Sequence, residues 1–392
     1  MVTVIVVVGA VVLWMPTIAD LWHILRVRPA AGPSREPLPR LLFLIPAHDE
    51  ELLVGHTIAS VRQLEYPADR VSIVVVADNC TDSTAETARA TGARVLERHD
   101  ARMRGKQHAL AWAIPHCELD AHDAVVILDA DTELDPGFAA ALAARAPLRD
   151  KVVQPYNGVQ NRADSAITRM AAVQSEAMHG LAFRLKARSG ITVPLSAGMC
   201  IGSGVLEERG WPAFSIGEDF ELYVILTLAG VSIDHAGDAR VYAQEARDLK
   251  QAGSQRRRWM SGRWYVFRRY TGAILRSRTL PVRQRLDALC EMTSVALGPA
   301  TQLALTFALA TLAFVSRVPA ATTLAVLVIA SLGRQVAYTA LAVSRDPEPW
   351  RAAFAFVRLP TYVVWRLAVA ASALLSSGTG AWVRTARHAR DR

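Results

Sequence analysis

The sequence predicts an α/β domain held on a membrane by helices near both ends of the chain, and three features support this. Short uncharged runs rich in branched residues are typical of buried parallel strands. Segments with helical character alternate with them, and this order implies a mostly parallel sheet. Hydrophobic residues make up 52% of the 392 residues, with long apolar runs near both ends. The predicted strands are 41–45, 71–77 and 125–128, and the predicted helices are 50–63, 83–91 and 106–114.

The first apolar run, over residues 2–19, carries no charge and is nearly long enough to cross a bilayer. A cleaved signal peptide is the alternative, but no Lys or Arg precedes the run and no clear small-residue cleavage site follows it. Four arginines follow between positions 26 and 40, and positive charge favours the cytoplasmic side. We therefore expect an anchor over 1–25 and a cytoplasmic domain over 38–250, in a multi-pass protein of the cell (inner) membrane.

The C-terminal third predicts two further spans over 291–343. The second of them contains Arg334, and a charge at that depth must reach the surface or meet a partner. Arg358 and Arg366 give the next helix a cationic face. Residues 350–392 therefore favour an amphipathic helix that lies in the membrane interface, followed by a basic tail, over a third C-terminal span.

Composition and missing motifs exclude several protein classes. The four cysteines have no CxxC spacing, which argues against a zinc site or a disulfide framework. A Walker loop and a Gly-x-Gly-x-x-Gly fingerprint are both missing, which disfavours kinase, ATPase and dinucleotide chemistry. The net charge of +8 comes with basic residues that adjoin membrane segments, so nucleic acid is not an expected partner.

Polar residues follow each of the three predicted strands. One such strand end is usually a helix cap, but three at one edge of a sheet indicate a binding site. The sharpest is Asp129-Ala130-Asp131, in which the two carboxylates point the same way. Paired carboxylate oxygens suit Mg²⁺ or Mn²⁺, which often bridge to a diphosphate.

Two later motifs add to this site. Glu218-Asp219 could bring a base that removes a proton from an attacking hydroxyl, or it could complement a helix dipole. The run Gln255-Arg256-Arg257-Arg258-Trp259 offers guanidinium groups for phosphate and an indole face for a sugar ring. Residues 251–290 also read as a basic aromatic belt at the membrane surface.

In this order, the motifs resemble those of membrane-bound family 2 glycosyltransferases, which include the cellulose, hyaluronan and poly-N-acetylglucosamine synthases and smaller relatives. The resemblance covers about 41–264. It implies a GT-A fold and transfer with inversion from a nucleotide sugar, by default a UDP-hexose or UDP-N-acetylhexosamine. It also implies a divalent cation, Mg²⁺ or Mn²⁺.

The resemblance implies a role for each matching residue. Asp219 would be the catalytic base, and Asp131 with Asp129 would hold the metal. The donor would be bound by Ala47, Glu50, Asp78, Lys106, Asp129 and Arg258. The acceptor would be bound by Gly202, Ser203, Glu218, Gln255 and Trp259.

The processive members of this family have enough transmembrane helices to line a polymer channel, and this chain has too few. We therefore expect a single addition, or a short series, onto a membrane-associated lipid or glycan acceptor. A processive polysaccharide synthase subunit is the second interpretation. A non-catalytic sensor or scaffold is a third, and it is disfavoured because Asp129, Asp131 and Asp219 are all present.

Overall fold

The computed structural model describes residues 1–29, 37–317 and 320–374. They form two units, which are described separately. Among the described residues, the sheet unit contains Pro29–Asn161 and Gly190–Glu245, and the helical unit contains Met1–Arg28, Arg162–Ser189 and residues 246–374. The segment predicted as one domain, 38–250, is thus interrupted by a helical excursion at Arg162–Ser189 that the sequence patterns did not indicate.

The sheet unit is built on one mixed eight-stranded sheet, in the order β3-β2-β1-β4-β7-β6-β8-β5. Strands β1 to β4 run parallel, β7 is antiparallel to β4 and β6, and β8 is parallel to β6 and antiparallel to β5. The predicted α/β class is therefore confirmed. The strands are β1 (Leu41–Ala47), β2 (Val71–Asp78), β3 (Arg94–Arg98), β4 (Ala124–Ile127), β5 (Thr132–Leu134), β6 (Val152–Val159), β7 (Cys200–Gly202) and β8 (Ile233–Ala243).

The core of the sheet unit lies against one face of the central strands. Phe43 and Ile45 of β1 are fully buried there, together with Ile58 of α2 (Val54–Arg62). Phe138 of α5 (Phe138–Ala143) packs beside Phe43, with ring centroids 6.3 Å apart. Side chains alternate along a strand, so this packing fixes which way each strand end points. The remaining helices of this unit are α3 (Thr84–Ala90), α4 (Lys106–Ala113), α8 (Ser203–Arg209) and α9 (Glu218–Leu228).

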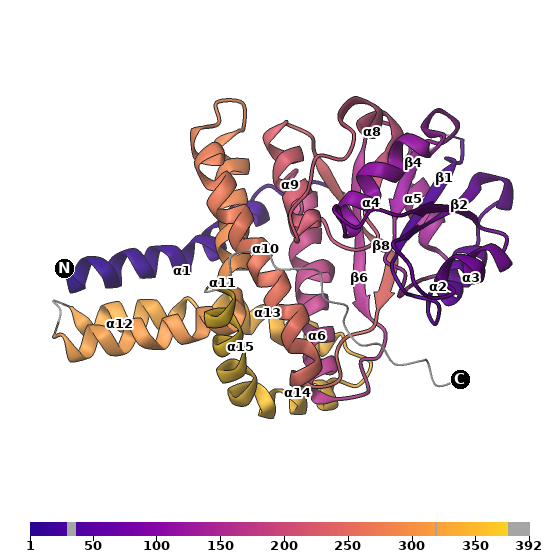
Figure 1. Ribbon diagram of the computed structural model, residues 1–392. Helices are drawn as coiled ribbons and strands as arrows, with labels where there is room; N and C mark the ends of the chain where they lie inside the picture. The colour runs from indigo at the N-terminus through magenta and orange to yellow at the C-terminus, as the bar shows by residue number, and fades with distance from the viewer. Residues whose placement is uncertain (30–36, 318–319, 375–392) are drawn as a thin grey trace. The chain divides into compact units, whose positions relative to one another are not determined.

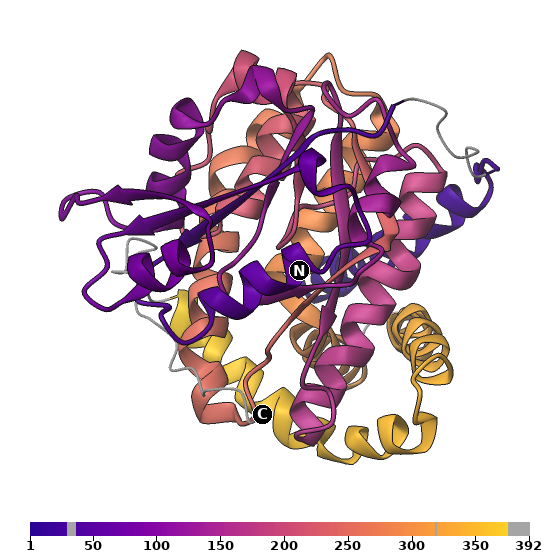
Figure 2. The same cartoon turned by 90° about the vertical axis from the view of Figure 1, so that its right-hand side faces the viewer.

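The helical unit contains one continuous helix from residue 166 to residue 188 and further helices of varied length, most of them apolar (Figures 1 and 2). The continuous helix consists of α6 (Ala166–Ser175), the π-helical η4 (Glu176–Phe183) and α7 (Arg184–Arg188). The others are α1 (Val2–Ile24), α10 (Leu249–Arg276), α11 (Val282–Val315), α12 (Ala321–Ala330), α13 (Gly333–Ser344), α14 (Pro349–Ala355) and α15 (Leu359–Leu374).

Helices α1, α11 and α12 pack together through a small apolar core that includes Leu13, Leu309 and Val328, and Figure 1 shows α1 beside α12. Large apolar residues such as Val8 and Phe307 are more than half exposed on the outside of this bundle. A surface of this kind matches a hydrocarbon environment, because soluble proteins rarely expose contiguous apolar patches this extensive.

By length and composition, three helices among the described residues could cross a membrane: Val2–Ile24, Ala321–Ser344 and Pro349–Ala373. A shorter apolar helix covers Thr301–Val315. The first two ranges coincide with expected spans. The third falls where the sequence predicts an interfacial helix, and that assignment stays a prediction. The basic tail lies outside the described residues.

Arg334 has the partner that its depth in an apolar helix requires. Its Nε lies 2.6 Å from Oδ2 of Asp20 on α1, and its guanidinium stacks over the ring of Tyr338 at 4.8 Å. Pairing of this kind is how ionisable groups are retained inside apolar helical bundles.

Candidate active site

The Asp-x-Asp motif forms a tight turn at the carboxyl end of β4. Both the backbone N–H and the hydroxyl of Thr132 bond to the carbonyl oxygen of Asp129, at 3.1 and 2.7 Å. Asp131 is buried, with 7% of its surface exposed, whereas the side chain of Asp129 is 38% exposed. The turn therefore presents one open carboxylate and holds a second just inside it.

Lys106 joins this turn to the Glu218-Asp219 motif. It is the first residue of α4, and its Nζ lies 2.6 Å from Oδ1 of Asp129 and 3.2 Å from Oε1 of Glu218. Glu218 and Asp219 are the first two residues of α9. The structure thus brings together four residues that the sequence singled out, from three separate segments of the chain. We call Lys106, Asp129, Glu218 and Asp219 the lysine cluster.

Charge in the lysine cluster is strongly unbalanced. Burial alone would lower the pKa of Lys106, but the carboxylates of Asp129 and Glu218 outweigh burial and hold that pKa above its usual range. The pKa of Glu218 is raised by burial and by the negative charges of Asp219 and Asp129, which act against Lys106. Three carboxylates thus surround one ammonium group, and a fourth, Asp131, lies two residues from Asp129.

A divalent cation fits this donor set. Carboxylate oxygens are the ligands that Mg²⁺ and Mn²⁺ prefer, and extra positive charge would relieve the repulsion among these acids. Asp131 and Asp129 would hold the cation, because they project from the same turn.

A buried carboxylate fixes the loop that leads into α9. Oε2 of Glu221 accepts the backbone N–H groups of Phe214 and Ser215, at 2.9 and 2.6 Å, and Glu221 is only 4% exposed. Glu221 was not among the residues predicted from the sequence. Its position four residues after the N-cap Gly217, among apolar neighbours, was the available signal.

The ends of β1 and β2 also meet, as expected for neighbouring parallel strands. A ring nitrogen of His48 lies 2.6 Å from the carbonyl oxygen of Asp78, and the N–H of Glu50 donates to Thr84 Oγ1 at 2.8 Å. Ala47, the last residue of β1, is buried. The donor-binding roles of Ala47 and Glu50 stay predictions.

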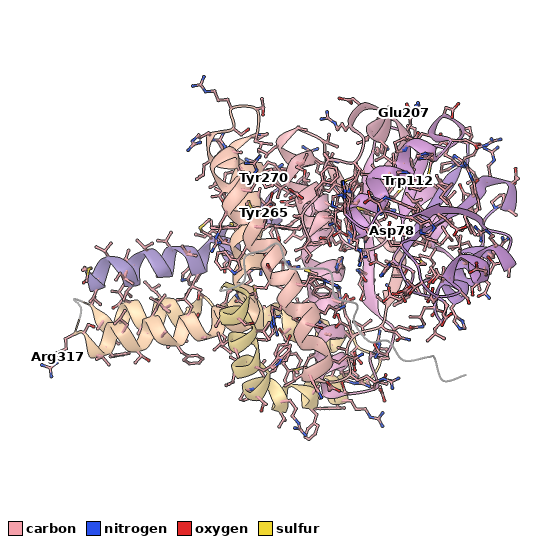
Figure 3. The ribbon with its side chains drawn as sticks, in the orientation of Figure 1. Asp78, Trp112, Glu207, Tyr265, Tyr270 and Arg317 are labelled. Carbon is pink, nitrogen blue, oxygen red and sulfur yellow. The ribbon has the colours of Figure 1, made fainter. Side chains whose placement is uncertain are left out.

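Asp78 is buried in an ion pair. Its Oδ1 lies 2.5 Å from Nη1 of Arg98 on β3, and both side chains are at most 6% exposed. Figure 3 labels Asp78 within the sheet unit. The pair ties β2 to β3, and the donor-binding role of Asp78 stays a prediction.

Gly202 and Ser203 lie at the opposite end of β4 from Asp129, and their acceptor role stays a prediction. Because β7 runs antiparallel to β4, Gly202 pairs with Ala124 at the amino end of β4, opposite to the end that leads to Asp129. Ser203 is fully buried and accepts a hydrogen bond from Arg149 at 3.0 Å. The segment before β7 is the part that reaches the carboxyl end of β4, where Gly198 N–H donates to Ile127 O.

The residues Gln255, Arg258 and Trp259 lie on α10, in the helical unit, and their predicted roles stay predictions. The guanidinium of Arg256 stacks over Trp259 at 4.5 Å. Tyr265 and Tyr270 follow on the same helix (Figure 3), which continues the aromatic and basic pattern of this segment.

A mixed α/β sheet with carboxylates and a lysine gathered at the carboxyl end of a central parallel strand defines a class of proteins that bind ligands at that edge. Comparison with known proteins identifies the family within this class. A model described as "Glycosyltransferase like family 2" matches residues 39–262, which is more than half of the chain. The chain therefore belongs to glycosyltransferase family 2, as the motifs indicated.

Named relatives agree with this assignment. A probable glycosyltransferase of Bacillus subtilis, YdaM, is 26% identical over 250 residues, covering 59% of this chain and 57% of the relative. Glucomannan 4-beta-mannosyltransferase 7 of Arabidopsis thaliana is 26% identical over 258 residues, covering 62% of this chain and 46% of the relative. The chain thus spans about half the length of the curated relatives it matches.

Among solved structures, the mannosyltransferase PcManGT from Pyrobaculum calidifontis, in complex with GDP-Man and Mn²⁺, has the same fold with a TM-score of 0.60. The match covers 96% of this chain and 98% of that chain at 17% sequence identity. The expected GT-A fold is therefore confirmed.

Proposed function

We propose that this chain is an inverting, metal-assisted glycosyltransferase that moves a hexose or N-acetylhexosamine from a nucleoside diphosphate to a membrane-associated lipid or glycan acceptor. The observation that carries the proposal is the lysine cluster, in which Lys106 joins the Asp-x-Asp turn to Glu218 beside Asp219. Glycosyl transfer needs positive charge near the departing diphosphate and a base near the attacking hydroxyl. The Lys106 ammonium lies between the candidate metal ligands and the candidate base, so both requirements are met in one place.

In this mechanism the acceptor hydroxyl attacks the anomeric carbon while the bond from that carbon to the diphosphate oxygen breaks. The electron pair of that bond leaves with the diphosphate, and Asp219 takes the hydroxyl proton. The Lys106 ammonium offsets the negative charge that develops on the leaving group, and its fixed position beside Asp129 costs no reorganisation during the reaction. A divalent cation bound by Asp131 and Asp129 would supply further positive charge to the diphosphate.

The donor is proposed to be UDP-linked, with GDP-mannose as the alternative to test. The family resemblance supports UDP, whereas a structural neighbour contains GDP-Man and a named relative is a mannosyltransferase. The Mn²⁺ in that neighbour supports Mn²⁺ or Mg²⁺ as the cofactor. Ala47, Glu50 and Arg258 remain proposed donor contacts, and Glu218, Gln255 and Trp259 remain proposed acceptor contacts.

We also propose that the sheet unit is cytoplasmic and that the N-terminus lies outside. The N–H of Arg28 bonds to the carbonyl oxygen of Arg188 at 2.9 Å, and Gly190 of the sheet unit follows two residues later, too few to cross a bilayer. At the other end of the bundle, Val6 packs against Ala313, close to the turn that carries Arg317 (Figure 3). The start of α1 therefore lies at the end of the bundle opposite to Arg28, which supports an N-terminus on the outer side.

The interfacial position proposed for residues 350–392 also has support within the helical unit. Helix α15 packs against α10 and α11, and α10 is rich in arginine along its whole length. A helix with that many charges does not lie in the hydrocarbon core, so α15 beside it favours the interface.

The proposal is tested by release of nucleoside diphosphate from purified protein in nanodiscs, with UDP-glucose, UDP-N-acetylglucosamine and GDP-mannose, in Mn²⁺ or Mg²⁺ and in EDTA. We expect EDTA-sensitive turnover of one donor. Asp219→Asn should lower kcat by about 10²–10⁴-fold and leave donor affinity nearly unchanged, because only the proton acceptor is lost. Asp131→Ala should instead weaken metal-dependent donor binding.

Protein that binds none of these donors would contradict the proposal and favour the scaffold interpretation. More than a few per cent of wild-type activity in Asp219→Asn would contradict the assignment of the base.

A further inference from the structure

A half-exposed phenylalanine lies close in sequence to two members of the lysine cluster, Glu218 and Asp219. Phe214 is 50% exposed, in the loop just before the Glu218-Asp219 motif. Single exposed apolar residues are common on protein surfaces, so exposure alone indicates nothing. The two features that distinguish Phe214 are its rigid backbone and its aromatic neighbour.

The backbone of Phe214 is fixed from the inside. The buried Glu221 carboxylate accepts the N–H of Phe214 at 2.9 Å and that of Ser215 at 2.6 Å. Two short hydrogen bonds to one buried carboxyl group hold this stretch of backbone in place. The backbone from which the exposed ring of Phe214 projects is therefore anchored to the interior of the sheet unit.

The ring faces His108 of α4. The centroids of the two rings are 5.6 Å apart, with an angle of 37° between the ring planes. We call His108 and Phe214 the aromatic pair. Lys106, two residues before His108, contacts Glu218, four residues after Phe214. The aromatic pair and the Lys106–Glu218 ion pair therefore join the same two segments, the start of α4 and the loop into α9.

From this placement we infer that the aromatic pair is the binding surface for the apolar face of the transferred sugar. This inference rests on the proposed function. One segment of the pair carries the lysine assigned to the leaving diphosphate, and the other carries the base assigned to the acceptor hydroxyl. The group that lies between a leaving group and an attacking hydroxyl is the sugar being transferred. Its C–H face matches a flat aromatic ring, and an exposed ring on an anchored backbone binds it with little ordering cost.

The inference is tested by titrating the protein in nanodiscs, with Mn²⁺ present, using nucleotide sugars and the corresponding bare diphosphates. The probes are UDP-glucose and UDP-N-acetylglucosamine against UDP, and GDP-mannose against GDP. Phe214→Ala should weaken binding of the nucleotide sugar by about three- to tenfold and change the Kd of the bare diphosphate by less than about twofold. Phe214→Tyr should keep wild-type affinity for both.

Matched variants distinguish the loss of a sugar contact from a general loss of folding. Phe354 on α14 is 75% exposed and lies in the helical unit, so Phe354→Ala is a control for loss of an exposed phenylalanine and should leave both affinities unchanged. If Phe214→Ala folds poorly, Phe214→Leu removes the flat face while keeping an apolar side chain, and it should show the same selective loss.

Three results would overturn the inference: equal weakening for sugar and diphosphate, no weakening for either, or an effect only on acceptor KM. The first would assign Phe214 a structural role and the third an acceptor role. If the wild-type protein binds neither nucleotide sugars nor diphosphates, the proposed function itself fails, whereas normal donor binding by both wild type and Phe214→Ala contradicts only the aromatic surface.

Discussion

Replacing Lys106 with glutamine tests whether this lysine stands in for cation charge at the Asp-x-Asp turn. At an effective dielectric constant of about 20, each ion pair, at 2.6 and 3.2 Å, has a gross Coulomb energy of about 5–6 kcal/mol. Desolvation offsets most of this, and breaking a fully buried pair costs about 3–5 kcal/mol net. Because the three side chains are 22%, 38% and 13% exposed, we expect a smaller loss, about 2–3 kcal/mol.

For a domain of this size that loss corresponds to a fall of roughly 4–12 °C in Tm, read from thermal unfolding in detergent with EDTA. Adding Mn²⁺ should narrow the gap to wild type, because the glutamine variant leaves Asp129 open to the metal and binding to the folded state stabilises it. Lys151→Gln is the matched control, since Lys151 is exposed and its Nζ donates to the carbonyl oxygen of Arg145 rather than to a carboxylate. The reasoning would be refuted if Lys106→Gln and Lys151→Gln had the same Tm in EDTA, or if Mn²⁺ did not raise the Tm of Lys106→Gln toward that of wild type.

Two further predictions concern ion pairs of the helical unit. Burial alone would raise the pKa of Asp287, but the Lys186 ammonium at 2.9 Å and a hydrogen bond with His23 hold that pKa below its usual range. Glu291 also contacts Lys186. The stability this contributes is fully present above about pH 4 and is lost as the pH falls through the lower folded pKa. Urea midpoints should therefore show wild type losing its advantage over Asp287→Asn only below about pH 4, and a constant advantage would contradict the assignment. For the second pair, a variant with both Asp20→Leu and Arg334→Leu should melt higher than either single variant, because a single change leaves an unpaired charge in an apolar bundle. Additive losses in a double-mutant cycle would show that the two residues are not coupled.

The strands that sequence reasoning located are those whose chemistry is uniform. β1, β2 and β4 are dominated by apolar and branched residues, and their positions were predictable to within two residues. β6 contains Gln154, Pro155 and Asn157, and β8 contains several charged residues, so neither shows the pattern of a buried parallel strand. β5 and β7 have three residues each, which is too short for any periodicity.

The same limits explain the outcome at the site. The proximity of Asp129 and Glu218 was predictable because both acidic motifs directly adjoin predicted apolar segments. That Lys106 forms ion pairs with both residues was not predicted. The ion pair of Asp78 was not predictable because its partner Arg98 lies on β3, a strand the sequence did not reveal. The position of Gly202 at the amino end of β4 was not predictable because strand direction in β7 depends on pairing with β4, which no local pattern records.

The excursion at Arg162–Ser189 makes the two units inseparable by simple trimming. Lys186 and Arg169 are buried within the helical unit, paired with Asp287 and with Asp346 and Glu348 from much later in the chain. A truncated protein that ends near residue 250, as a soluble version would, keeps both basic residues and discards all of their acidic partners. A soluble version is therefore better obtained by replacing the outward apolar residues of α1, α11 and α12 than by cutting the chain.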